Sequence, residues 1–135
     1  MQQVYVYDAV RTPFAKLGGG LAKVRPDDLA ANVIQTMVER YPNLDQSKID
    51  EVVFGNANGA GEENRNVARM ASLLAGLPTS VPGLTVNRLC ASSLDAAIHA
   101  SYSIGSGDNN LVLTGGTESM SRAPYVVPKP ERAYP

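Results

Sequence analysis

The sequence predicts an α/β fold in which helices pack against a mainly parallel β-sheet. Four short runs of β-branched, aromatic and aliphatic residues are spaced along the chain, at 3–7, 51–54, 84–87 and 111–114. Three longer stretches with apolar residues at helical spacing lie between them, which makes the order β-α-β-α-β-α-β. Strands that alternate with helices usually pair in parallel through right-handed crossovers.

The first half of the chain is expected to form a strand, a loop and a helix. Three consecutive glycines at 18–20 make the segment after the first strand a loop. Pro26 suits the first turn of a helix, because its missing N–H would have no partner there. Apolar residues then recur at every fourth position, and this stripe stops before Pro42: Leu29, Val33 and Met37.

The second half contains two more expected helices. Asn64 is expected to cap the second helix, because asparagine accepts hydrogen bonds from the free N–H groups at a helix start. The third helix is expected to begin near Cys90 or Ser92, directly after the strand at 84–87. The strand at 111–114 completes the alternation. We therefore expect one domain over residues 1–120, followed at 121–135 by an extended, proline-containing tail or the start of a loop region.

Composition excludes several classes of function. A net charge of −1 provides no basic field for nucleic acid or an anionic membrane, and no apolar run has the length of a membrane span. The chain has one cysteine and one histidine, so neither an internal disulfide nor a metal site is expected. No secretory leader is evident at the N-terminus, and the expected location is the cytoplasm.

Cys90 is the residue most suited to covalent chemistry. An apolar strand leads into it and a helix leads out, so the positive end of the helix dipole and free N–H groups favour negative charge on its sulfur. Its own backbone N–H is a candidate donor to an oxyanion. Position alone does not distinguish a nucleophilic Cys90 from a cysteine that acts as a small buried apolar residue.

Three motifs resemble those of the thiolase family, and they occur in the family's order. They are VNRLCAS at 86–92, GGTESMS at 115–121 and AVRTPF at 9–14. The similarity extends from about Val4 to Pro124 and identifies Cys90 as the nucleophile. One position departs from the family's usual pattern, because Ser93 stands where a glycine is common, and a serine there is expected to strain or reshape the turn if glycine is required.

The resemblance implies the N-terminal part of a fold built from two similar halves, and an acetyl-CoA C-acyltransferase activity. Cys90 would attack the 3-keto carbon of a 3-oxoacyl-CoA, acetyl-CoA would leave, and the acyl group would remain on the sulfur until CoA removes it. CoA and acyl-CoA would be substrates, with no permanently bound cofactor. The family also implies a homodimer or a higher homo-oligomer.

The catalytic base and acid are missing from the expected site. In thiolases a histidine and a second cysteine perform these roles. The one histidine here, His99, lies nine residues after Cys90, roughly 13 Å along a helix, which is too far for direct contact. The isolated chain is therefore expected to be inactive.

The segment around Arg65 and Arg69 resembles that of thiolases acting on 3-oxoadipyl-CoA, whose acyl chain ends in a carboxylate. These two arginines are expected to share one helix face, with Glu62 able to pair with either. An arginine near the acyl end would bind the carboxylate in a bidentate manner. The alternatives are a short-chain acetoacetyl-CoA thiolase, a non-catalytic fragment or assembly module, and a ketoacyl synthase, which the motifs fit less well.

Overall fold

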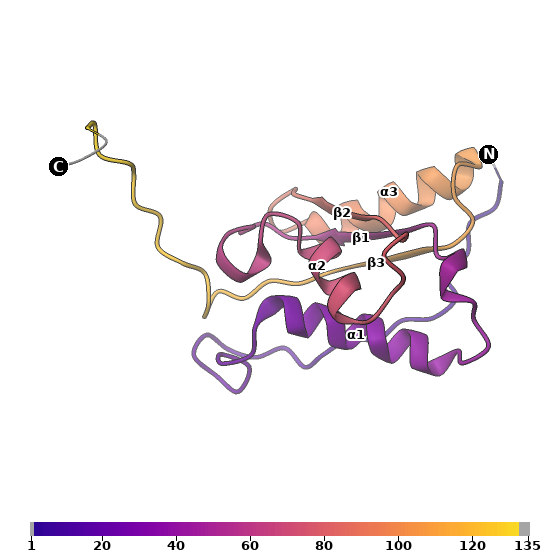
Figure 1. The fold of residues 1–135 in the computed structure, drawn as a ribbon, viewed down its shortest axis with the longest axis horizontal. Helices are drawn as coiled ribbons and strands as arrows, with labels where there is room; N and C mark the ends of the chain where they lie inside the picture. The colour runs from indigo at the N-terminus through magenta and orange to yellow at the C-terminus, as the bar shows by residue number, and fades with distance from the viewer. Residues whose placement is uncertain (1, 133–135) are drawn as a thin grey trace.

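Residues 2–132 are described by the computed structural model (Figure 1). Three strands, β1 (Glu51–Gly55), β2 (Gly83–Val86) and β3 (Val112–Gly116), form a parallel sheet of order β2-β1-β3. The helices are α1 (Pro26–Arg40), α2 (Val67–Leu74) and α3 (Ser92–Ser106), with two short 3₁₀ turns, Gln46–Lys48 and Gly61–Glu63. The expected α/β class and parallel sheet are confirmed.

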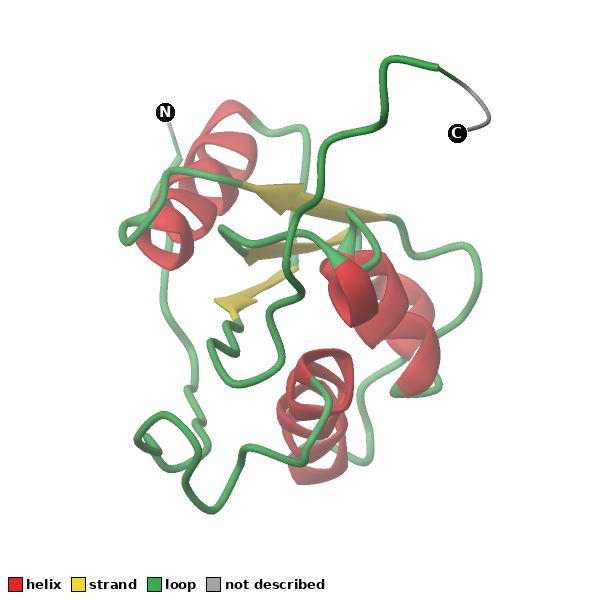
Figure 2. Cartoon of the chain, turned by 90° about the vertical axis from the view of Figure 1, so that its left-hand side faces the viewer, coloured by secondary structure: helices red, strands yellow, loops and turns green. Residues whose placement is uncertain are grey.

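Helices cover both faces of the sheet. Figure 2 shows α3 on one face, with α2 and α1 on the other. The central strand β1 is buried on both sides: Val52 and Phe54 belong to the core shared with α1 and α2, and Val53, which alternates with them, is fully buried too. A strand that is buried on both faces carries a continuous apolar run. The run at the end of residues 51–54 therefore allowed this strand to be predicted from the sequence.

The expected N-terminal strand is wrong. Residues 3–7 form no strand. Just before them, the backbone N–H of Gln2 donates a hydrogen bond to the carbonyl of Gly105, 3.1 Å away, near the end of α3. Tyr5 and Val6 are exposed. Residues with high β-propensity favour a strand only where a neighbouring strand completes the hydrogen-bond ladder, and within residues 2–132 none lies beside this segment.

The second helix begins later than expected, and its cap is Asn66 rather than Asn64. The Asn66 side chain accepts from the N–H of Arg69 and donates to the carbonyl of Gly83 at the start of β2. Asn64 instead adopts a left-handed backbone conformation with φ of 49°. The contact with β2 favours Asn66 over Asn64 as the cap. This contact is tertiary, and the local sequence does not reveal it. None of the helices in the described part of the chain is long and apolar enough to span a membrane.

Candidate active site

The three motif segments line one cavity of about 1680 Å³. The cavity wall includes residues 9–14, residues 115–121 after β3 and, around the cysteine, Leu89, Cys90, Ser92 and Ser93. They lie far apart in the sequence, but β2 and β3 run parallel on either side of β1, so the carboxyl ends of all three strands meet at one edge of the sheet. Loops that follow this edge of a parallel sheet form the usual ligand site of α/β folds.

Two glycines allow the start of α3 to approach this edge. Gly55 ends β1 and Gly116 ends β3, and a Cβ at Gly55 would overlap the backbone of Ser92 and Ser93. A Cβ at Gly116 would overlap the Ser93 hydroxyl. Ser93 lies in regular right-handed helix, and its backbone is not among those with positive φ. The expected strain at Ser93 is therefore absent, and its hydroxyl occupies space that Gly116 leaves open.

A tight turn between β2 and α3 presents Cys90 to solvent. Leu89, directly before it, has a left-handed backbone with φ of 50°, which turns the chain sharply between strand and helix. Ser92, which is almost fully buried, holds the turn closed: its hydroxyl accepts from the N–H of Arg88 at 2.9 Å and donates to the carbonyl of Leu89 at 2.6 Å. Cys90 is thus an exposed thiol on a turn held by buried hydrogen bonds.

Asn87 connects this turn to the loop after β1, and Glu118 connects the segment after β3 to the same loop. The Asn87 side chain accepts from the N–H of Leu89 and donates to the carbonyl of Ala57. Glu118 accepts from the N–H groups of Ala57 and Asn58 at 2.7 and 3.0 Å, so the structure places it as a hydrogen-bonded carboxylate. These roles of Asn87 and Ser92 were not assigned from the sequence, although an asparagine that accepts from the N–H two residues on is a recognised turn pattern.

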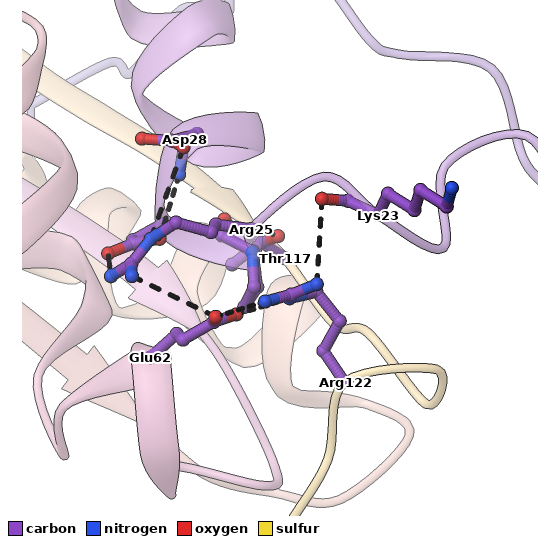
Figure 3. A network of polar contacts seen from close by, with 8 residues as sticks. Lys23, Arg25, Asp28, Glu62, Thr117 and Arg122 are labelled. Atoms are coloured by element: carbon purple, nitrogen blue, oxygen red, sulfur yellow. Dashed lines mark hydrogen bonds and ion pairs between the residues drawn. The ribbon is translucent and has the colours of Figure 1, made fainter.

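An ion-pair cluster joins the 3₁₀ turn Gly61–Glu63 to the start of α1 and to the segment after β3 (Figure 3). Glu62 receives a bidentate pair from Arg122 and lies 3.8 Å from Arg25, which itself pairs with buried Asp27 at 2.7 Å. The hydrogen bonds from Arg122 lower the pKa of Glu62. The expected pairing of Glu62 with Arg65 or Arg69 is wrong, because Arg122, 60 positions away in the sequence, occupies its carboxylate.

The two arginines of this segment have different environments. Arg65 lies outside α2 with φ of 60°, so the expected shared helix face does not exist. Arg69 donates to the carbonyls of Val81 and Thr79 at 2.6 and 3.1 Å, and thereby supports the loop before β2. Arg65 faces a separate cavity of about 500 Å³ beside Asn87.

Two other titratable groups, His99 and Glu63, lie outside the wall of the cavity around Cys90. The His99 imidazole lies 3.9 Å from the Glu51 carboxylate on the outer part of α3, and it is not part of the cavity wall around Cys90. Glu63 is buried, and desolvation raises its pKa above the usual range although Asn58 donates to it. Within residues 2–132, no three His, Cys, Asp or Glu side chains are placed to hold a metal ion together.

Comparison with known proteins identifies the family of this domain. Residues 4–134 match the family described as "Thiolase, N-terminal domain". A "Beta-ketoadipyl-CoA thiolase" of Pseudomonas knackmussii is 60% identical and covers 98% of this chain, and the "3-oxoadipyl-CoA/3-oxo-5,6-dehydrosuberyl-CoA thiolase" of Escherichia coli is 53% identical over 99%. The chain spans 33% of the length of each, or about a third.

A solved structure agrees with the sequence comparison. The acetyl-CoA acetyltransferase of Bacillus anthracis superposes with a TM-score of 0.81 at 37% identity, and the match covers 89% of this chain and 30% of that one. The expected family and its N-terminal fold are therefore confirmed. This chain belongs to the thiolase family and corresponds to its N-terminal domain.

Proposed function

We propose that this domain supplies the nucleophile of a thiolase that cleaves a 3-oxoacyl-CoA to acetyl-CoA and a shortened acyl-CoA. The observation that carries the proposal is the exposed Cys90 thiol, on a hydrogen-bonded turn that lines the same cavity as the other two thiolase motifs. The relatives named for beta-ketoadipyl-CoA make 3-oxoadipyl-CoA the proposed substrate.

The proposed reaction has two steps. The Cys90 thiolate attacks the C3 carbonyl, with its backbone N–H as a proposed donor to the oxyanion, and the C2–C3 bond breaks. Acetyl-CoA leaves as its enolate and takes up a proton. The thiolate of free CoA then attacks the acyl thioester and regenerates Cys90. CoA thioesters are thus substrates, and no resident cofactor enters the scheme. Because the nucleophile must stay reduced, the cytoplasm is the compartment we propose.

Acylation of Cys90 tests this proposal directly. In an enzyme of full thiolase length that carries these 135 residues, incubation with 3-oxoadipyl-CoA in the absence of free CoA is expected to add one succinyl group to Cys90, because the thiol is exposed on its turn. The adduct is seen as a mass increase on the peptide that contains Cys90. Cys90→Ser is the matched control and should remain unmodified. An adduct on lysines alone, or none on Cys90 while iodoacetamide alkylates it readily, would reject Cys90 as the acyl carrier.

We also propose that the domain associates as a homodimer or higher oligomer. Within residues 2–132, β2 pairs with β1 alone, so its other edge has no strand partner, and Leu94 and Tyr102 are exposed on α3. Open strand edges and exposed apolar patches commonly bind a partner. Light scattering is expected to give a mass above that of the monomer at high concentration. A monomer across the accessible concentration range would contradict the proposal.

A further inference from the structure

Arg65 faces a polar cavity that the reaction at Cys90 does not use. This cavity, of about 500 Å³, is formed mainly by the loop after β1 and by residues of and just after β2. Its polar wall includes the side chains of Asn64, Thr85 and Asn87. Glycine and alanine residues of the loop also line the cavity, and their small side chains do not fill it. It is large enough for the end of a small acyl chain, since ligand pockets begin at about 300 Å³.

The Arg65 guanidinium has no hydrogen-bond or ion-pair partner within residues 2–132. The acidic residues nearest to it in sequence are both occupied: Arg122 and Arg25 surround Glu62, and Glu63 is buried against Asn58. The other arginines, apart from Arg132 near the end of the described chain, bind carboxylates, carbonyls or an aromatic ring: Arg11, Arg25, Arg40, Arg69, Arg88 and Arg122. A cation facing a cavity without a counter-charge is suited to an anionic ligand.

The backbone holds Arg65 in this position at a cost. Asn64 and Arg65 both have left-handed φ values, 49° and 60°, and the N–H of Arg65 donates to the carbonyl of Gly59 at 2.8 Å. Such a conformation is rare for arginine and disfavoured relative to right-handed helix. It places Arg65 outside α2, which begins at Val67.

The cavity adjoins the turn that carries Cys90. Ala57 lines both this cavity and the larger one that contains Cys90. Asn87 lies in the wall of the Arg65 cavity, and its side chain bonds to the backbone on both sides: the N–H of Leu89 in the nucleophile turn, and the carbonyl of Ala57. An acyl chain attached to Cys90 would therefore lie next to this polar cavity, and Arg65 is the cation in the cavity wall.

We propose that Arg65 binds the terminal carboxylate of a dicarboxylic acyl chain and selects such chains over neutral ones. This inference rests on the proposed function. It also accounts for the names of two relatives, since adipyl and dehydrosuberyl chains differ in length but both end in a carboxylate. Arg69 is excluded from this role because two backbone carbonyls already occupy its guanidinium.

The test compares two substrates of equal chain length in an enzyme of full thiolase length that carries these 135 residues. 3-Oxoadipyl-CoA and 3-oxohexanoyl-CoA both have six-carbon acyl chains, and they differ by a carboxylate in place of a methyl group. Arg65→Asn removes the charge with a residue that tolerates a left-handed backbone. We expect the ratio of kcat/KM for the dicarboxylic over the neutral substrate to fall at least about tenfold, the loss of a charge-assisted bidentate contact.

Two further variants distinguish selection from a structural role. Arg65→Lys keeps the charge and is expected to retain part of the ratio, whereas Arg69→Met is expected to lower thermal stability and leave the ratio unchanged. A ratio that Arg65→Asn does not change would overturn the Arg65 proposal alone, because the parent enzyme would still cleave both substrates. A parent enzyme that cleaves neither thioester would refute the proposed function, and this inference with it.

Discussion

No multiple-turnover thiolytic activity is expected from the 135-residue chain alone. Attack on the substrate needs a base within hydrogen-bond reach of the thiol, and the leaving enolate needs an acid. Cys90 is the one cysteine of the chain, and the one histidine, His99, faces Glu51. Catalytic groups that act as a unit fail together, so the loss should be several orders of magnitude rather than a modest fraction.

The assay follows the absorbance of the 3-oxoacyl-CoA in the presence of free CoA. Stoichiometric acylation of Cys90 is compatible with the prediction, whereas repeated turnover is not. Adding the remaining two-thirds of a beta-ketoadipyl-CoA thiolase should restore turnover if the two pieces associate. Sustained turnover by the pure chain, abolished by Cys90→Ser, would show that these 135 residues contain an unrecognised acid and base.

Replacing Gly55 with alanine is expected to destabilise the fold by about 3 kcal/mol or more. The added Cβ would overlap the backbone where α3 begins, at Ser92 and Ser93, and no side-chain rotation can relieve a clash between backbone and Cβ. The helix would have to move away from the sheet, which would displace the turn that carries Cys90 as well. Urea unfolding followed by circular dichroism measures the change.

Gly20→Ala is the matched control. A Cβ at Gly20 meets no atom within 4 Å, and Gly20 is not among the glycines with positive φ. Its free energy of unfolding should stay within about 0.5 kcal/mol of the parent chain. Equal stability of Gly55→Ala and Gly20→Ala would mean that the start of α3 does not pack closely against Gly55 at the end of β1.

Most of the fold was predictable from local patterns. The strand β1 has a strong signal in its apolar run, and the helix α1 has two, namely a proline in the first turn and a regular apolar stripe. The N-terminal segment has an equally good strand composition, yet it forms none within the described residues. Composition reports which residues suit a pleated surface, but a strand exists only where another strand pairs with it.

The ion pairs and caps were less predictable. Sequence spacing favours local partners, so Glu62 was assigned to arginines a few residues away, whereas Arg122 binds it from across the fold. Asn66 was preferred over Asn64 as a cap because it also bonds to β2. In both cases the decisive partner is distant in sequence, and no local rule contains that information.

The sequence by itself determined the α/β class and the thiolase resemblance, and it singled out Cys90 as the proposed nucleophile, because short-range periodicity and contiguous motifs carry that information. Only the tertiary structure decided which residues surround the thiol. It joined three separate motifs around one cavity, positioned α3 through Gly55 and Gly116, and separated Arg65 from Arg69. The physical reason is that close packing and hydrogen bonding act between atoms near in space, and parallel crossovers bring together residues that are far apart along the chain.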